Sequence, residues 1–343
     1  YSGPTWYITE SGNDTTATGA SDDPFRSIQA GINFSSDADS VTVAAGTYVE
    51  NINFRGRNIK VVGEDRETTI IDGNQNGLVV MINNSSNSSL LESFTIQNGN
   101  GGSGTINGAG VYCDGCTTVL KNLNITENNQ DQSGDGSGIY SYLGNIDIEN
   151  VKVTNNAGYF GAIGILNQST ATLNNVTVSN NVNLNWGGGI YIHNATANIS
   201  NTEISNNTAG SGGGLFVTNS NSVVNLDRLT IVGNTATQTG GGIYADDGTS
   251  FQLINSIIWD NAPQGIDGAG SRNITYSDIE TGVVGVGNID IYPMFVDTAN
   301  GDYHLLASSQ CINAGHPDST DSDGTIADIG AYPYLNSYSG PTW

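Results

Sequence analysis

Four aspartates near the end of the chain have the residue type and spacing that could bind a hard cation. Asp318, Asp321, Asp323 and Asp328 follow one another closely, with Gly324 among them. Calcium takes oxygen ligands, and carboxylates that alternate around a glycine can wrap one ion. The full calcium-loop template is not met, however. The sequence therefore predicts either a Ca²⁺ site, the one cofactor that it indicates, or four aspartates that form turns and caps.

Two of the three cysteines form a Cys-x-x-Cys pair, Cys113 and Cys116. Such a pair indicates redox chemistry when it lies beside a βαβ unit, whereas this one lies in a glycine-rich stretch. A local disulfide across the turn is therefore the prediction, within the geometric limits of disulfides. Cys311 is predicted to be a buried apolar filler.

Asparagines in Asn-x-Ser/Thr sequons recur along the chain and are glycan acceptors only in a glycosylating host. Sequons in predicted loops are the better candidates, and these are Asn13, Asn87 and Asn194. Asn175 also lies in a sequon, but it belongs to the structural repeat described below. We predict a structural role for Asn175 and glycan attachment for the three loop asparagines.

The histidines and tryptophans give weaker indications of a site. His193, His304 and His316 lie in unrelated segments, which predicts no metal cluster. Trp186 and Trp259 could be platforms on which sugars stack, but their positions suit packing about as well.

The elements that must position these residues come from a phrase repeated from Leu120 to Asn261. Each copy has an apolar-x-apolar triplet, followed three places later by an asparagine. The asparagines are Asn128, Asn156, Asn181, Asn207, Asn234 and Asn261, at spacings of 28, 25, 26, 27 and 27 residues. A fixed period of this size indicates a repeat architecture, and the alternation within each triplet indicates strands. Leucine-rich repeats need a different template and propeller blades are longer, so a parallel β-helix is predicted.

The asparagine column has a physical reason. At a corner between strands, asparagine tolerates left-handed backbone angles and bonds its own backbone, and stacked amides can bond to one another. A second column with the same period consists of glycines, each followed by an aliphatic residue; they are Gly110, Gly138, Gly164, Gly189, Gly214 and Gly242. Strand counting predicts about ten coils, each adding about 4.8 Å along the axis.

Composition excludes some functions. The chain has 343 residues, 36% of them hydrophobic, and a formal net charge of −24. This acid excess repels phosphate backbones, so we expect no nucleic-acid partner. No apolar run approaches the roughly 20 residues of a membrane-spanning helix, so we expect no membrane span. The chain opens at Tyr1 without a leader, which favours a mature or excerpted protein.

The patterns divide the chain into four predicted segments. A short helix over Pro24–Ile32 would bury Phe25, Ile28 and Ile32 on one face and close the end of the core. The predicted segments are an opening strand with this capping helix over 1–40, the β-helix over 41–291, a C-terminal cap over 292–336, and a linker over 337–343.

Two parts of the chain resemble a known family. The beginning is similar to secreted right-handed β-helix proteins of the pectate-lyase-like superfamily in the segments Trp6–Thr9, Pro24–Ile32, Val43–Ile52, Val62–Glu64 and Thr69–Gly73. The ending, from Cys311 to Tyr332, resembles the segment named "choice-of-anchor Q" that closes many bacterial surface β-helix proteins. This resemblance implies a single right-handed parallel β-helix and an extracellular setting. It does not imply an activity, because a fold hosts many functions.

The resemblance also shows where enzymatic residues would be expected. Pectate-lyase-like enzymes use an Arg or Lys base with carboxylates that hold calcium; Arg228, beside Asp227 and with Arg272 later in the chain, is the candidate. The alternative is a surface arginine that replaces one corner amide. Asp246 and Asp247 resemble the aspartate pair of polygalacturonase-like hydrolases, but the companion motifs are absent and a solvated turn is favoured. We therefore assign no catalytic residue.

One hexapeptide occurs twice, at residues 1–6 and again at 338–343. This recurrence predicts one period of a longer array or a head-to-tail fibre, and contacts that do not close give filaments. The expected function is a non-catalytic extracellular module of a surface fibre or adhesin, with copies of itself as partners. The alternative is a polysaccharide lyase or hydrolase, or a carbohydrate-binding β-helix module.

Overall fold

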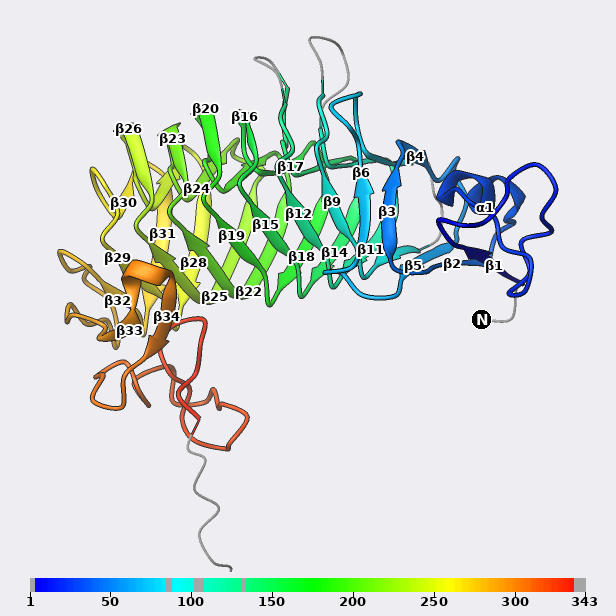
Figure 1. Cartoon of the computed structure of the whole chain (residues 1–343). Helices are drawn as coiled ribbons and strands as arrows, with labels where there is room; N and C mark the ends of the chain where they lie inside the picture. The colour runs from blue at the N-terminus through cyan, green and yellow to red at the C-terminus, as the bar shows by residue number, and fades with distance from the viewer. Residues whose placement is uncertain (1–3, 84–87, 102–107, 131–133, 336–343) are drawn as a thin grey trace, which may run out of the picture.

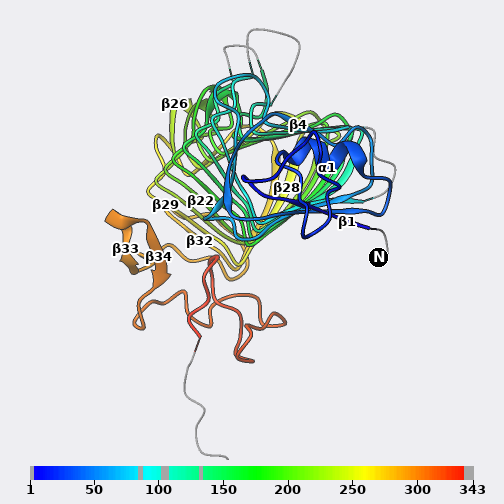
Figure 2. The same ribbon diagram turned by 45° about the vertical axis from the view of Figure 1, so that its right-hand side comes forward.

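The computed structural model describes residues 4–83, 88–101, 108–130 and 134–335 as a parallel β-helix. The coils follow one another along the axis in chain order (Figure 1). In the oblique view of Figure 2 they lie one behind another, and helix α1 (Ile28–Phe34) lies across the N-terminal end. This arrangement confirms the all-β, parallel β-helix prediction.

Strands at equivalent places in successive coils pair in parallel and form three long stacks. The first stack holds β1 (Thr5–Ile8), β2 (Ser40–Val43), β5 (Lys60–Gly63), β8 (Ser89–Glu92), β11 (Thr117–Lys121), β14 (Asn145–Glu149), β18 (Thr170–Asn174), β22 (Thr196–Ser205), β25 (Val223–Val232), β28 (Ser250–Ile254) and β31 (Ser271–Thr275). The second holds β3 (Gly46–Val49), β6 (Thr69–Asp72), β9 (Thr95–Gln97), β12 (Asn124–Thr126), β15 (Lys152–Thr154), β19 (Thr177–Ser179), the second halves of β22 and β25, β29 (Ile257–Trp259) and β32 (Asp278–Ile279). The third holds β4 (Ile52–Asn53), β7 (Val80–Asn83), β10 (Val111–Asp114), β13 (Ile139–Tyr142), β17 (Ile163–Leu166), β21 (Ile190–His193), β24 (Leu215–Thr218), β27 (Ile243–Ala245) and β30 (Ile266–Asp267).

A smaller stack of four strands stands beside the third one. It holds β16 (Ala157–Phe160), β20 (Val182–Trp186), β23 (Thr208–Ser211) and β26 (Thr235–Thr239), seen along the upper edge of Figure 1. Aromatic residues of the third stack pack against these strands: Tyr191 and Phe160 lie 5.2 Å apart between ring centroids, and Phe216 and Trp186 lie 5.3 Å apart. The extra stack thus covers an aromatic row on the outside of the helix.

The solenoid makes about 8 turns, fewer than the about ten that strand counting predicts. The difference arises because some strands do not belong to complete turns. Strand β1 pairs with β2, but the chain between them forms α1. At the other end, β30 and β32 have two residues each and no later strand stacks on them in the described residues.

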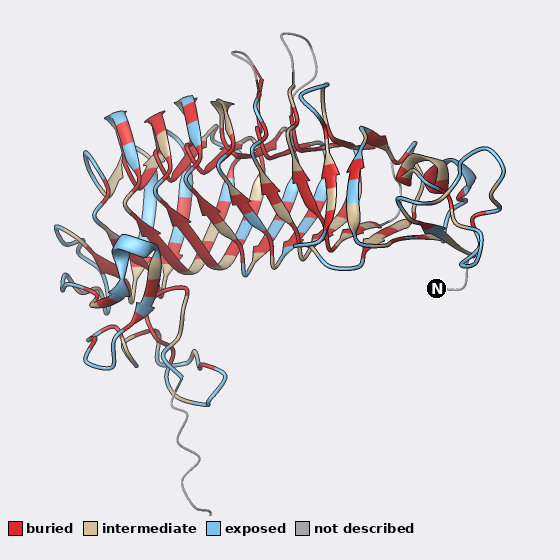
Figure 3. Cartoon of the chain, viewed as in Figure 1, coloured by how far each residue is buried: buried red, intermediate tan, exposed pale blue. Residues whose placement is uncertain are grey.

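The core lies inside the coils, where alternate residues of many strands are buried (Figure 3). Strand β14 shows the pattern clearly, since Ile146 and Ile148 are buried while Asn145, Asp147 and Glu149 are exposed. Burying apolar surface gives about 25 cal/mol per Å², so the interior row carries most of the driving force.

The six repeated asparagines form one continuous buried column. The Asn181 side chain illustrates the bonding: its Nδ2 donates to Val153 O and to Asn207 Oδ1, each at 2.9 Å. Its Oδ1 accepts from Asn156 N at 2.9 Å and from Asn156 Nδ2 at 3.1 Å. The same pattern links Asn128 to Asn156 and Asn234 to Asn261. From Asn128 to Asn234, each side chain therefore bonds polar groups of the coil before it and of the coil after it.

The N-terminal end is closed by α1, which begins later than predicted. The helix covers Ile28–Phe34 rather than Pro24–Ile32, because Ser27 is its N-cap and accepts a hydrogen bond from Ala30 N at 3.2 Å. Phe25 precedes the helix in a β-bridge with Ile8 and stacks on Phe34 at 4.8 Å. Ile28 and Ile32 are still buried in the core.

The segment predicted as a C-terminal cap lies along the side of the last coils instead of over their end (Figure 1). It contains the antiparallel pair β33 (Phe295–Asp297) and β34 (Asp302–Leu305), joined by the short 3-10 helix Thr298–Asn300. Its buried residues form a second core with Val232 and Ile257, which face outward from the solenoid. At the C-terminal end of the β-helix, Val283 packs on the main core.

None of the helices in the described ranges is long and apolar enough to cross a membrane.

Candidate functional site

The described surface has two cavities of about 380 Å³ with the side chains that a binding site needs. One is rich in carboxylates and lies at the N-terminal end, and the other is rich in aromatic rings and lies near the C-terminal segment.

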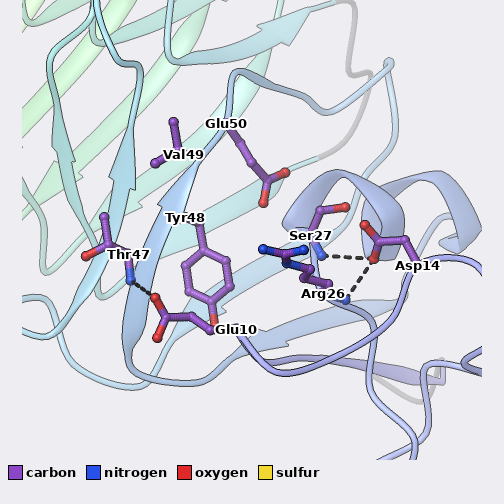
Figure 4. Close-up of a pocket in the computed structure, with 8 residues that line it drawn as sticks. All are labelled: Glu10, Asp14, Arg26, Ser27, Thr47, Tyr48, Val49 and Glu50. Carbon is purple, nitrogen blue, oxygen red and sulfur yellow. Dashed lines mark hydrogen bonds between the residues drawn. The ribbon is translucent and has the colours of Figure 1, made fainter.

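The N-terminal cavity brings three carboxylates, one arginine and one tyrosine together. Figure 4 shows Glu10, Asp14, Glu50 and Tyr48 around the Arg26 side chain. Burial raises the pKa of Glu50, although hydrogen bonds from Gln29 and Ile28 oppose the shift. For Asp14, hydrogen bonds from the N–H groups of Ser27 and Arg26 overcome the effect of burial and lower the pKa. Two carboxyls with pKa values moved apart are the arrangement of an acid–base pair.

The hydrogen bonds of these carboxylates show a structural use. Glu50 accepts from Ile28 N at 2.8 Å and from Gln29 N at 3.0 Å, one bond to each carboxylate oxygen. Those N–H groups belong to the first turn of α1, which has no intrahelical partner for them. Glu10 likewise accepts from Thr47 N at 2.9 Å. The cavity therefore anchors the capping helix to the first coils, and its acids are already engaged.

The second cavity, which we call the Trp259 cavity, lies between the last coils and the C-terminal segment. Its lining includes Asn206, Gly233, Trp259, Asp260, Tyr292 and Tyr303. Trp259 and Tyr292 meet edge to face with ring centroids 6.1 Å apart. Asn206 Nδ2 donates to the Tyr303 hydroxyl at 3.1 Å. Aromatic walls with a few placed amide, carboxylate and hydroxyl groups are typical of a small-ligand site.

The four C-terminal aspartates do not gather around one point. The Asp328 carboxylate accepts from Asn313 N at 2.7 Å and from Tyr334 N at 2.6 Å. Asp321 Oδ2 accepts from Asp328 N at 2.9 Å, and Asp323 accepts from Thr325 N at 3.1 Å.

Asp318 is exposed and its N–H donates to His316 Nδ1. Within the described residues, no group of three or more His, Cys, Asp or Glu side chains is placed to hold a metal ion. The contacts of these aspartates are those of turn formers, and Ca²⁺ binding stays a prediction.

Arg228, the candidate base, faces the C-terminal segment. Its guanidinium donates to Thr320 O at 2.9 Å and lies 3.8 Å from the Asp321 carboxylate. Arg272 is exposed on β31. Arg228, which stands where other coils have a corner asparagine, thus links the C-terminal segment to the solenoid.

The remaining aspartate and histidine candidates have local roles. Asp246 lies in the turn after β27 and accepts from the Thr218 hydroxyl at 3.0 Å and from Asp247 N at 2.9 Å. His193, at the end of β21, is half-buried and stacks beside Tyr191 at 6.3 Å. Nothing in these contacts converges on a common substrate position.

The cysteines and the sequons are placed as follows. Cys113 and Cys116 are joined by a disulfide with Cα atoms 5.6 Å apart, and Cys311 is a buried thiol. Asn13 is exposed, but its Oδ1 accepts from Thr15 N at 2.8 Å. Asn194 is half-buried, and its Oδ1 accepts from the Asn221 side chain at 3.3 Å. Asn87 and both copies of the hexapeptide's Tyr-Ser-Gly start lie outside the described residues.

Sequence reasoning missed most of the Trp259 cavity. It noted Trp259 but not Tyr292, Tyr303 or Gly233, because these residues meet only through the packing of the C-terminal segment. One indication was available. The outward positions aligned with Trp259 in the two preceding coils hold Val232 and Ser205, so a tryptophan there departs from the pattern. Asp135 was also missed; burial raises its pKa to about 6.

Comparisons with known proteins agree with this architecture. The sequence profile of the family described as "Right handed beta helix region" matches residues 78–258 and 161–285, which together span more than half of the 343 residues. No curated protein matches the sequence.

Among solved structures, the chain is similar to the pectate lyase Pel9A, with a TM-score of 0.60 and 14% identity over 98% of this chain and 97% of that chain. A GH136 lacto-N-biosidase from Eubacterium ramulus matches with a TM-score of 0.46 and 12% identity, over 79% of this chain and 64% of that chain. Identities this low show the fold alone. The family match and the observed coils lead to one conclusion: the chain belongs to the right-handed β-helix family.

Proposed function

We propose that this chain is a non-catalytic, extracellular structural module and forms one unit of a tandem or head-to-tail surface fibre or adhesin. The observation that carries the proposal is the continuous asparagine column from Asn128 to Asn261, in which the amides of successive coils bond to one another. Such a column fixes the spacing of the coils and makes a stiff rod, because bending would open buried hydrogen bonds.

Two further features support a structural role. The carboxylates of the N-terminal cavity and of the C-terminal segment accept backbone hydrogen bonds, so they are engaged in holding the ends of the rod. The hexapeptide shared by residues 1–6 and 338–343 supports a serial arrangement of modules. The resemblance of the ending to the segments that close bacterial surface proteins supports an extracellular location.

Electron microscopy of the native assembly tests the fibre. The proposal expects rods that repeat at a fixed axial distance, joined end to end. Isolated rods at all concentrations, with no continuation of the sequence into another copy, would contradict it.

The alternative, a polysaccharide lyase or hydrolase, shares its fold with the pectate lyase Pel9A. An assay on polygalacturonate with and without Ca²⁺ separates the two functions. The structural module gives neither unsaturated product nor new reducing ends under either condition, whereas a lyase would give the first and a hydrolase only the second. Calcium-dependent product that disappears in Arg228→Ala would establish the lyase instead.

A further inference from the structure

We propose that the Trp259 cavity is a binding site for a neutral sugar residue of a glycan. This site goes beyond the structural role proposed above and does not depend on it. Four observations carry the inference: a missing side chain, an aromatic wall, polar groups beside that wall, and the absence of cationic side chains from the lining.

The missing side chain is that of Gly233. The residue before each asparagine of the column has a left-handed backbone. Its φ is 57° at Asn180, 54° at Asn206, 65° at Gly233 and 53° at Asp260. Asparagine and aspartate adopt this conformation readily, so it does not by itself demand glycine. A Cβ at Gly233 would lie 2.6 Å from Asn206 Oδ1. Glycine therefore leaves the space beside it to the Asn206 amide, with which a side chain at residue 233 would collide.

Two rings border this space. Trp259 is half-buried and Tyr292 is 56% exposed, so their faces are within reach of a ligand. Trp259 ends β29 at a position that pairs with Val232, which in turn pairs with Ser205. Large rings with a polar end are the side chains that combine apolar contact with hydrogen bonding. A sugar presents C–H groups on its ring face and hydroxyls around its edge, which matches such a wall.

Polar groups stand beside the wall. Asn206 is held by its bond to the Tyr303 hydroxyl, and that hydroxyl belongs to a ring that is 3% exposed. The Phe295 ring packs on Tyr303 at 5.3 Å and fixes it further. Asn206, Gly233 and Asp260 occupy the same position in three successive coils, so Asp260 lies one coil beyond Gly233. The Asn206 amide is held in place and the Asp260 carboxylate can accept hydrogen bonds from sugar hydroxyls; groups that are already ordered favour binding.

Charge selects the class of sugar. Asp260 is the one charged residue of the lining, which contains no Lys, Arg or His within the described part of the chain. Burial raises the pKa of Tyr303, and the nearby charges of Glu203 and Asp260 act against ionisation as well. A uronate would therefore meet negative charge with no cation to pair with it. The lining therefore favours a neutral hexose or pentose. The volume of the cavity, about 380 Å³, lies in the lower part of the range of about 300–1,000 Å³ for ligand sites.

Titration of the full chain tests the site. The probes are cellohexaose, xylohexaose and mannohexaose as neutral glycans and hexagalacturonate as the acidic one, with binding followed by tryptophan fluorescence and calorimetry. At least one neutral probe should bind saturably and at least tenfold more tightly than hexagalacturonate.

Two variants and one control locate the binding. Gly233→Asn restores the residue type of its column and should weaken the affinity at least tenfold while the chain stays folded by circular dichroism. Trp259→Ala should weaken it by a similar factor. Trp186→Ala is the matched control, because Trp186 is a 38% exposed ring on β20 that does not line the cavity, and its affinity should be unchanged.

Three results would overturn the proposal: no binding of any neutral probe, tighter binding of hexagalacturonate, or equal affinity in Gly233→Asn and the unmodified chain. If Trp259→Ala fails to fold, Gly233→Asn decides.

Discussion

The coils between Leu120 and Asn261 and the segment from Ile291 to Leu335 are stabilised in different ways. In the coils, residues contact their counterparts one turn away, as Asn181 does with Asn156 and Asn207. In the C-terminal segment each contact occurs once, as when Tyr332 donates to Glu203 at 2.5 Å. Periodic contacts spread stability evenly along a solenoid, whereas single contacts concentrate it at a few side chains.

The largest expected effect comes from breaking the column in its middle. Asn181→Ala removes four hydrogen bonds inside the protein, those to Val153 O and Asn207 Oδ1 and those from two donors of Asn156. Asn207 Oδ1 keeps the Asn181 N–H, and Asn156 Nδ2 keeps its bonds to Ile125 O and Thr154 O. Each lost bond is worth about 1 kcal/mol, and a buried group left unsatisfied costs about 1–3 kcal/mol, so the free energy of unfolding should fall by at least about 3 kcal/mol. Urea denaturation measures it.

Asn145→Ala is the matched control, because Asn145 is exposed on β14. It should change the free energy of unfolding by about 0.5 kcal/mol or less. Equal losses in the two variants would show that the column does not stabilise the coils.

The next effect concerns Asp278, where the two regions meet. Its fully buried carboxylate accepts from Cys311 Sγ at 3.2 Å and from Ile291 N at 3.1 Å. Burial raises its pKa from 3.8 to about 6. Between about pH 4 and 6, Asp278 is therefore protonated in the folded state but ionised in the unfolded state. The free energy of unfolding consequently falls as the pH rises through about 6.

Asp278→Asn removes this ionisation. The variant should be more stable than the unmodified chain above pH 7, by about 3 kcal/mol at most, and the two should converge below pH 4. Thermal melts from pH 4 to pH 8 measure the difference. A constant difference at every pH would show that Asp278 does not titrate in this range.

A smaller effect is expected where the C-terminal segment docks. Tyr332→Phe leaves the buried Glu203 carboxylate without the Tyr332 hydroxyl, while Ser205 still donates to it. Losing one such bond should weaken docking by about 1–3 kcal/mol. Limited proteolysis should then cut the segment faster and leave the solenoid intact.

Tyr334→Phe serves as the control, since the Tyr334 ring is 37% exposed. Its cleavage rate should match that of the unmodified chain. Faster cleavage inside the coils of Tyr332→Phe would mean that the two regions are not independent.

The smallest effect is expected on the surface of the coils. Lys121 Nζ and Glu149 Oε2 lie 3.0 Å apart on neighbouring strands, and both side chains are largely exposed. Exposed ion pairs contribute little to stability because water and salt screen them, so Lys121→Ala should shift the urea midpoint only slightly. A loss as large as that of Asn181→Ala would contradict the view that the periodic stability lies inside the coils.

The sequence predicted the coils because their contacts repeat. The fixed spacing of Asn156, Asn181 and Asn207 reveals which residues stack, and no other information is needed to place them. Helix α1 was predicted with the wrong start, because its boundary depends on Glu50, a residue from a later coil that binds the first N–H groups.

The candidate site was largely beyond sequence reasoning. In the C-terminal segment, Ala331 N donates to Thr230 Oγ1, 101 residues earlier in the chain. Gly330 N donates to Asn255 O, which lies about 75 residues earlier. No periodicity in the sequence predicts these pairs. The apolar outward residue Val232 did give an indication, since the strand position pairs with Ser205. An apolar side chain on a solvated face indicates that something covers it.

Amide hydrogen exchange of the unmodified chain tests the contrast most directly. Peptides from the coils between residues 145 and 261 should exchange last and at similar rates, because opening one coil exposes the column of its neighbours. Peptides from residues 295 to 335 should exchange earlier, through local detachment. Exchange of the coils as fast as the C-terminal segment, or coil by coil at unrelated rates, would contradict the account.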